Sequence, residues 1–171
     1  LGNTNTVVAF QDQKDINSVL VEIPNITSSP GVIPSAVWFE EPSKIPKIGI
    51  SALKMRDKSN SDLFFHSNFK RLIGNSIEKI NQKNILNPNE CGEKFFQILW
   101  ANIPHKYEIK RLVLTAPIDT YKGYREWLVN LCEDISVDEI ALVDEPTAAS
   151  LGIDVPFGSK IMTLDIGGST V

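Results

Sequence analysis

The sequence has no excess of basic residues and no long apolar run. Its 171 residues include 17 Lys and Arg against 21 Asp and Glu, so the formal net charge at pH 7 is −4. A chain with this balance presents no broad positive field that would attract nucleic acid. No apolar stretch approaches the roughly 20 residues that a membrane-spanning helix needs. We therefore expect neither nucleic acid nor a membrane among its partners.

Cysteine and histidine are also scarce. Cys91 and Cys132 lie far apart without C-x-x-C spacing, and the only histidines are His66 and His105. A structural zinc site needs a cluster of such ligands, so we expect none. Two separated thiols are typical of a reducing compartment, which favours a cytoplasmic protein. The chain begins with Leu1 rather than Met, so its true amino terminus is not seen.

Two common nucleotide-binding motifs are missing from the sequence. The Walker A pattern G-x-x-x-x-G-K-[ST] does not occur, which excludes a P-loop protein. No G-x-G-x-x-G follows a predicted strand, which counts against a dinucleotide-binding fold.

The apolar content, 42% of residues, suits one globular domain or two small subdomains with an ordinary core. Two strand patterns joined by a polar turn predict an antiparallel hairpin over residues 6–10 and 18–23. A further short strand is predicted over 36–39, followed by a loop over 40–47 that is rich in Pro and Lys.

Two helices are predicted in the middle of the chain. The first covers residues 62–73 and ends at Gly74, with Leu72 and Ile73 facing inward. The second covers residues 90–102, and three of its apolar side chains recur on one face: Phe95, Leu99 and Ile103.

After residue 106, strands and helices alternate regularly. The predicted elements are a strand over 111–115, a helix over 123–135, a strand over 139–143, a helix over 145–151 capped by Asp144, and a strand over 160–164. This order indicates parallel pairing. Together with the antiparallel hairpin, it predicts an α/β protein with a mixed sheet and flanking helices.

Two short runs at opposite ends of the chain resemble each other. Leu1-Gly2-Asn3-Thr4 and Ile166-Gly167-Gly168-Ser169 both read apolar, glycine, small or polar, hydroxyl. Glycine at a tight bend lets the backbone approach a ligand, and the N–H groups there can face an anion. Asp165 enters the second bend, where its carboxylate could hold Mg²⁺ through water. Two such loops suggest a pair of clamps on one polyphosphate, whereas the plain alternative for Asp165 is an ordinary Asp-Gly turn.

Two further runs carry charged residues in places that suit a ligand site. Glu145 falls in a first helical turn at the carboxyl end of a strand, where α/β proteins form ligand sites. Helix capping accounts equally well for an acidic residue there. Lys70 and Arg71 are adjacent cations on a short predicted helix, and a solvated charged face is the usual outcome of such a pair.

Five runs, in order along the chain, resemble the nucleotide-binding domain of the seventy-kilodalton heat-shock chaperones of the DnaK type. They are Leu1-Gly2-Asn3-Thr4-Asn5-Thr6, Ile33-Pro34-Ser35, Lys70-Arg71-Leu72-Ile73-Gly74, Asp144-Glu145-Pro146-Thr147-Ala148-Ala149 and Asp165-Ile166-Gly167-Gly168-Ser169-Thr170. The resemblance implies an actin-like ATPase (ribonuclease H-like) fold, of which this chain holds the first lobe, truncated at both ends.

The resemblance also implies a site for ATP and Mg²⁺. The phosphate loops would be formed by Gly2, Asn3, Thr4, Gly167, Gly168, Ser169 and Thr170. Asp165 would hold the Mg²⁺ shell through water, Lys70 would orient the attacking water and the γ-phosphate, and Glu145 would help to position or deprotonate that water. Thr170 completes the group expected to act in catalysis.

The sequence departs from the family's pattern at both phosphate loops. Asn3 stands where these chaperones usually carry Thr, and Ser169 stands where they usually carry a third Gly, so a Cβ could crowd the γ-phosphate. These departures favour a divergent member in which ATP hydrolysis is less assured than ATP binding.

The resemblance divides the chain into three parts. Residues 1–34 and 107–157 would form the core subdomain of the first lobe, and residues 35–106 an inserted peripheral helical subdomain. Residues 158–171 would be the first strand and phosphate loop of a second lobe that lies beyond Val171.

We therefore expect a fragment of a molecular chaperone whose full-length form hydrolyses ATP and works with unfolded client proteins and cochaperones. The fragment alone is expected to bind ATP poorly and not to turn it over. The alternatives are a non-catalytic nucleotide-binding regulatory module and an actin-like filament protein.

Overall fold

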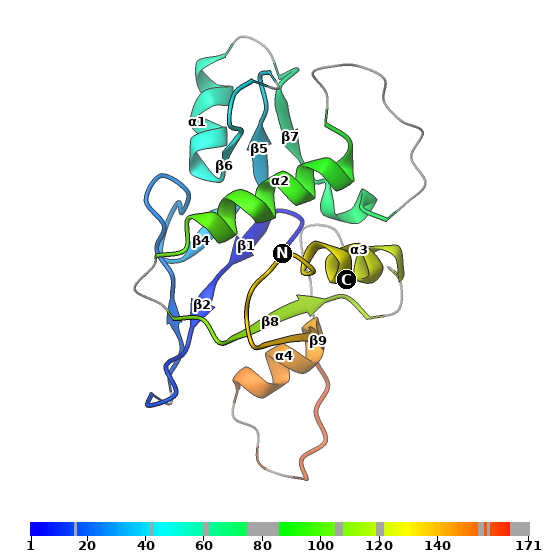
Figure 1. Ribbon diagram of the computed structural model, residues 1–171. Coiled ribbons are helices and arrows are strands. Elements are labelled where there is room, and N and C mark those ends of the chain that lie inside the picture. Colours follow the sequence, from blue (N-terminus) through cyan, green and yellow to red (C-terminus); the bar gives the residue numbers. More distant parts are fainter. Residues whose placement is uncertain are drawn as a thin grey trace.

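The computed structural model describes residues 1–15, 17–41, 43–59, 62–74, 86–104, 108–118, 122–153, 156 and 158–164. Helix α2 (Pro88–Ala101) crosses the middle of the molecule (Figure 1). A small antiparallel sheet with one helix lies on one side of α2, and a parallel strand pair with two helices lies on the other. Among the described residues, no helix has the length and apolar character needed to cross a bilayer.

The amino-terminal strands form two antiparallel pairs. β1 (Asn5–Val7) pairs with β4 (Val32–Pro34), and β2 (Ala9–Phe10) pairs with β3 (Val19–Leu20). The hairpin predicted over residues 6–10 and 18–23 is confirmed only for residues 9–10 with 19–20, because Thr6 and Val7 pair with β4 instead. A break at Val8 lets the first run pair with two different partners.

A three-stranded sheet lies at the far side of α2. β5 (Ala36–Trp38) is its central strand, flanked by β6 (Lys47–Ile48) and β7 (Phe65–Ser67), both antiparallel to it. Helix α1 (Ile50–Lys58) packs on this sheet through the fully buried Ala52.

The helix predicted over residues 62–73 is wrong. Residues 65–67 instead form β7, because they complete the backbone hydrogen bonds of β5, and Phe64 packs edge-on against Trp38 with ring centroids 5.7 Å apart. Only a 3₁₀ turn, η1 (Lys70–Leu72), remains helical. Ile73 is buried as expected, but Leu72 is 40% exposed.

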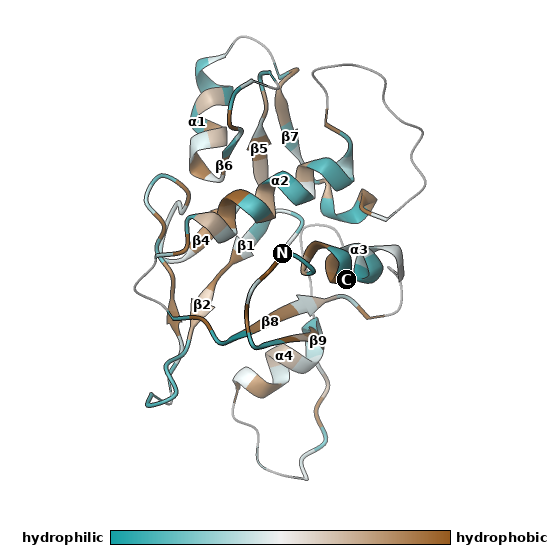
Figure 2. Cartoon of the chain, in the orientation of Figure 1, coloured by the Kyte–Doolittle hydropathy of each residue, from teal (hydrophilic) through white to brown (hydrophobic). Residues whose placement is uncertain are grey.

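Helix α2 has a complete amino-terminal cap. The Asn87 side chain accepts a hydrogen bond from the Glu90 N–H, and the Glu90 carboxylate accepts one from the Asn87 N–H, both at 2.9 Å. The predicted apolar face is confirmed, because Phe95 and Leu99 are buried and Ile103 packs against the same core. In Figure 2 this helix carries both brown and teal segments, as an element with one buried face should.

The first four of the alternating strands and helices predicted after residue 106 are confirmed in type and order. β8 (Arg111–Ala116) pairs in parallel with β9 (Glu139–Asp144), followed by α4 (Glu145–Gly152). Helix α3 (Lys122–Leu131) connects the two strands.

A single mixed sheet is not present among the described residues. The strands there form four separate small sheets, three antiparallel and one parallel, and no described strand joins β8 or β9 to the amino-terminal pairs. The chain is therefore mixed α/β with small sheets and helices.

The strand predicted over residues 160–164 is also wrong. This segment has no regular secondary structure, and its apolar side chains are exposed, with Met162 at 91% and Leu164 at 69%. An apolar run becomes a strand only where a partner completes its backbone hydrogen bonds, and none of the described strands pairs with this segment.

The main core is closed by two contacts that only glycine permits. At Gly92 of α2, a Cβ would lie 2.6 Å from the Trp127 ring and 2.8 Å from Ile73. At Gly74, which has a φ of 79°, a Cβ would lie 2.3 Å from the main chain of Gly123. These contacts join α2, η1 and α3, and they fix the place of the residues on η1.

Candidate functional site

Lys70 lies on a short turn that is anchored on both sides. Phe69 before it is buried and packs against Phe95 of α2 with ring centroids 6.0 Å apart. Ile73 after it is buried in the same core, and Gly74 presses on the start of α3. These anchors fix the backbone of η1, so the Lys70 side chain starts from a defined position.

Glu145 begins α4 at the carboxyl end of β9. The sequence predicts that Asp144 caps this helix, and Asp144 does occupy the cap position, but its side chain makes no capping hydrogen bond. Its carboxylate instead forms an ion pair with Arg125 of α3. Asp144 therefore ties the start of α4 to α3.

The structure brings Lys70 and Glu145 together. The Lys70 Nζ donates to Glu145 Oε1 at 2.6 Å, across 75 residues of sequence. The two side chains are 12% and 24% exposed, so both have lost most of their contact with water. Among the described residues it is more shielded than the ion pairs of Lys44, Arg56, Lys110, Arg111 and Arg125, whose side chains are all 39% exposed or more.

The loop of Gly2, Asn3 and Thr4 is held by Ser35. The Ser35 hydroxyl donates to the Gly2 carbonyl at 2.7 Å, and the Ser35 N–H donates to the Thr4 carbonyl at 2.9 Å. A Cβ at Gly2 would lie 1.9 Å from the carbonyl oxygen of Asn5, so this bend accepts only glycine. The sequence alone predicts no role for Ser35, although the run Ile33-Pro34-Ser35 contains it.

Asn3 connects this loop to the segment that carries Lys70. Its side-chain amide donates to the Asn68 side-chain oxygen at 3.0 Å, and Asn68 has a φ of 57°. The main-chain nitrogen of Leu1 lies within electrostatic range of both Lys70 and Glu145. The first predicted phosphate loop and the Lys70–Glu145 pair thus lie at one place in the fold.

This place suits an anion. The main-chain N–H groups of Gly2, Asn3 and Thr4 donate no hydrogen bond to any residue that the structure describes. Unpaired N–H groups at a bend, together with a lysine, are the donors that bind phosphate oxygens in proteins.

The remaining predicted site residues fall outside the described part of the chain. These are Asp165, Gly167, Gly168, Ser169 and Thr170. Within the described part, no group of three or more His, Cys, Asp or Glu side chains is placed to hold a metal ion.

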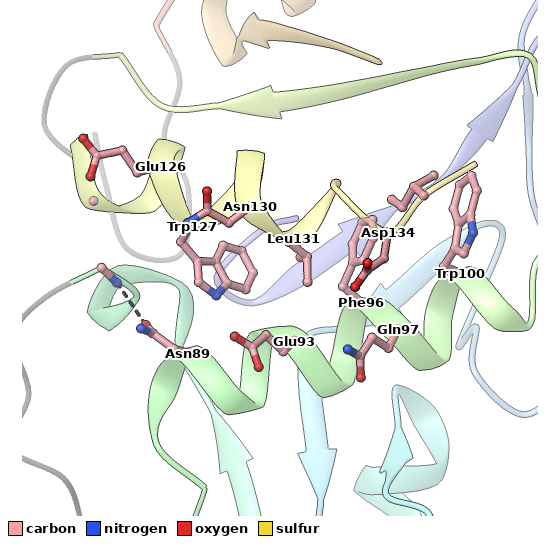
Figure 3. Close-up of a pocket in the computed structure, with 13 residues that line it drawn as sticks. Asn89, Glu93, Phe96, Gln97, Trp100, Glu126, Trp127, Asn130, Leu131 and Asp134 are labelled. Atoms are coloured by element: carbon pink, nitrogen blue, oxygen red, sulfur yellow. Dashed lines mark hydrogen bonds between the residues drawn. The ribbon is translucent and has the colours of Figure 1, made fainter. Parts of the chain in front are cut away.

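A groove of about 700 Å³ lies elsewhere, between α2 and α3 (Figure 3). Three carboxylates line it, from Glu93, Glu126 and Asp134, together with aromatic rings that include Phe96 and Trp100. None of its lining residues is Lys or Arg. The negative charge of these side chains makes the groove unsuitable for a polyphosphate.

Comparison with known proteins shows similarity to chaperones along nearly the whole chain. The chain is 29% identical over 175 residues to "Chaperone protein DnaK" of Mycoplasmopsis synoviae (strain 53) and 30% identical over 177 residues to that of Metamycoplasma hominis. It is 25% identical over 207 residues to "Chaperone protein dnaK" of Cyanidium caldarium. Each match covers 99% of this chain.

The chain spans about 28% of the length of the first two relatives and 31% of the third. No protein-family profile matches it. The resemblance to the DnaK type that five runs of the sequence indicate is confirmed by these matches.

Proposed function

We propose that this chain, which is related along its length to chaperones of the DnaK type, forms part of the ATP-binding and ATP-hydrolysing domain of a divergent chaperone. The observation that carries the proposal is the 2.6 Å pair of Lys70 and Glu145 near the loop of Gly2, Asn3 and Thr4, which Asn3 joins to Asn68 at 3.0 Å. A shielded cation, a carboxylate and N–H groups that no described residue accepts from are the groups that phosphoryl transfer uses.

In this proposal the residues divide the work by their chemistry. The N–H groups of Gly2, Asn3 and Thr4 bind phosphate oxygens, and Lys70 neutralises charge on the γ-phosphate and orients the attacking water. Glu145 positions that water and accepts its proton as the water oxygen bonds to the γ-phosphorus and the bond to the bridging oxygen breaks.

The second half of the proposed site comes from the resemblance. Gly167, Gly168, Ser169 and Thr170 are proposed as the second phosphate loop, with Thr170 also acting in catalysis. Asp165 is proposed to hold Mg²⁺ through water, and the metal supplies positive charge that offsets the charge of the phosphates.

The first test measures thermal stabilisation and phosphate release on the native protein with the sequence that flanks this chain in its gene. We expect Mg-ATP to raise the Tm, and we expect Lys70→Ala and Asp165→Asn each to abolish phosphate release. Lys44→Ala is the matched control, because Lys44 is an exposed cation that pairs with the exposed carboxylates of Glu40 and Glu41. A wild-type protein whose Tm does not respond to ATP would contradict the proposal.

One observation favours a non-catalytic nucleotide-binding module as the second candidate. The Asn3 side-chain amide donates to Asn68, so this N–H group is not available to donate to a phosphate oxygen. Stabilisation by Mg-ATP without phosphate release from the wild-type protein would support this candidate.

The division of the chain is likewise proposed from the resemblance. Residues 1–34 with 107–157 are the core of the first lobe, 35–106 the peripheral subdomain, and 158–171 the entry into a second lobe. The whole protein is proposed to act in the cytoplasm on unfolded client proteins together with cochaperones. The binding and hydrolysis of ATP are proposed to drive this action.

A further inference from the structure

Tyr124 lies directly beneath the lysine of the candidate site. It belongs to the first turn of α3, next to Gly123, whose backbone touches Gly74. The Lys70 Nζ lies 5.4 Å from the centre of the Tyr124 ring, within the range of a cation–π contact. Tyr124 is 1% exposed, and its ring packs against Trp127 with centroids 5.6 Å apart. The ring therefore has little freedom to move away from the ammonium.

Filling space does not explain a tyrosine at this position. Its hydroxyl is buried and has no hydrogen-bond partner among the residues that the structure describes. A buried hydroxyl left unpaired lowers stability, so the hydroxyl gives no reason for this side chain. Burial and the nearby Glu145 carboxylate raise the pKa of the phenol, so the ring stays neutral at physiological pH. What tyrosine offers here, and leucine does not, is the electron-rich face of an aromatic ring.

The Lys70 ammonium thus has two different partners. Glu145 attracts it through a full charge, and Tyr124 attracts it through a neutral ring. A phosphate that binds the Lys70 ammonium competes with the Glu145 carboxylate, because both anions accept hydrogen bonds from the same ammonium N–H groups. The ring does not compete in this way, because its attraction for the cation needs no hydrogen bond.

We propose that Tyr124 is a positioning residue for Lys70: its ring holds the ammonium in place while the charge partner changes from Glu145 to a phosphate of the nucleotide. This inference rests on the proposed function, since it says how the Lys70 ammonium of that site is held in position. The part of the side chain that matters is the ring, and the hydroxyl is dispensable.

The test compares Tyr124→Phe, which keeps the ring, with Tyr124→Leu, which removes it. Tyr124→Met serves as a second non-aromatic variant should Tyr124→Leu fold poorly. The first readout is the NMR shift of the Lys70 ε-protons in this chain, which the ring current of Tyr124 displaces upfield. We expect the displacement to persist in Tyr124→Phe and to disappear in both non-aromatic variants.

The second readout is steady-state phosphate release by the native protein with its flanking sequence. Without the ring, we expect kcat to fall by about tenfold while the KM for ATP changes by less than about threefold. Tyr124→Phe should restore kcat to the wild-type value. A purely structural role would lower the Tm of the non-aromatic variants and leave the kcat of the folded fraction unchanged, which overturns the proposal.

The remaining outcomes are also decisive. Equal losses of kcat in Tyr124→Phe and Tyr124→Leu would assign the effect to the hydroxyl and overturn the role of the ring. An undisplaced Lys70 signal in the wild type would overturn the contact itself. Absence of any response to ATP in the wild type would instead refute the proposed function, while the NMR comparison still decides whether the ring holds the lysine.

Discussion

Lys70 and Glu145 lose most of their hydration together, so each depends on the other. Their side chains are 12% and 24% exposed, and removal of either partner leaves a shielded charge without its counter-ion. The stability of the folded chain and the charge balance of the candidate site therefore depend on the same contact.

A double-mutant cycle measures this dependence. We expect Lys70→Met and Glu145→Gln each to lower the free energy of unfolding by about 2 kcal/mol, less than for a fully buried pair because both side chains retain some solvent contact. The double variant should lose less than the sum of the two, because it leaves no uncompensated charge. Urea unfolding of the four proteins gives the coupling energy, and strict additivity would contradict the contact.

His66 gives the chain a pH dependence below neutrality. Burial lowers the pKa of its ring below the ordinary 6.5, and its Nε2 has no partner among the described residues. At pH values between the lowered pKa of the folded state and the ordinary pKa of the unfolded state, the folded state therefore binds fewer protons than the unfolded state. We expect the free energy of unfolding to decline as the pH falls from 6.5 toward the lower folded pKa, and then to level.

Urea unfolding between pH 7.5 and 5 tests this expectation, with the His66 ring followed by NMR titration. His66→Gln is the matched variant, and it should remove this part of the slope. A His66 ring that titrates at or above 6.5 in the folded protein would be inconsistent with it.

At the scale of elements, the joint between η1 and α3 is made of backbone rather than side chains. Gly74 has a φ of 79°, and its Cα faces Gly123 so closely that a Cβ would lie 2.3 Å from the Gly123 carbonyl carbon. Both the conformation and the space exclude a larger residue.

We expect Gly74→Ala to lower the free energy of unfolding by at least about 2 kcal/mol, since a positive φ and a backbone clash add. Gly152→Ala is the control, because nothing lies within 4 Å of a Cβ there and the residue ends α4. That substitution should be neutral or slightly stabilising. Chemical unfolding measures the free energy of unfolding of both variants. Equal decreases would show that the contact between Gly74 and Gly123 does not contribute to stability.

The sequence predicts well the elements whose apolar residues repeat at the spacing of one buried face. Phe95 and Leu99 recur on one face of α2, and β8 and β9 flank a helix at the spacing of a parallel pair. Helix α1 escapes prediction because it follows Gly49 without a capping side chain and buries only Ala52. Residues 65–67 mislead because their partner, β5, lies about thirty positions earlier in the chain.

The residues of the candidate site also fall into two groups, those that the sequence reveals and those that it does not. Lys70 and Glu145 stand out because runs around them match a known family. Ser35, Arg125 and Tyr124 do not stand out, because a serine after a proline, a helical arginine and a buried tyrosine are ordinary until their remote contacts are seen. Their roles arise from pairs far apart in sequence, which no local pattern encodes.

At the scale of the whole molecule, residues 161–164 expose three apolar side chains, although Thr163 shares a hydrogen bond with Ser150 of α4. Ile161, Met162 and Leu164 are 48%, 91% and 69% exposed, and they follow directly on the β8–β9–α4 unit. Contiguous exposed apolar side chains promote association between copies of a chain.

We expect this chain to self-associate as its concentration rises, and we expect replacement of Ile161, Met162 and Leu164 by Ser to reduce that association without lowering the Tm. Ile45→Ser is the control, because Ile45 is 78% exposed but isolated in a loop far along the chain. Sedimentation velocity at several concentrations checks both. A concentration-independent monomer in the unsubstituted chain would rule out the expectation.

The sequence distance between Lys70 and Glu145 has a consequence for synthesis. The carboxylate leaves the ribosome only after α2, β8, α3 and β9 have been made, 75 residues behind the lysine. Closing so long a loop costs chain entropy before the contact is gained, so this pair forms late in folding. A nascent chain that ends before residue 145 carries an unmatched lysine and, on the proposed function, half a binding site. On the proposed function, no nascent chain that stops short of residue 145 holds both charged groups of the site.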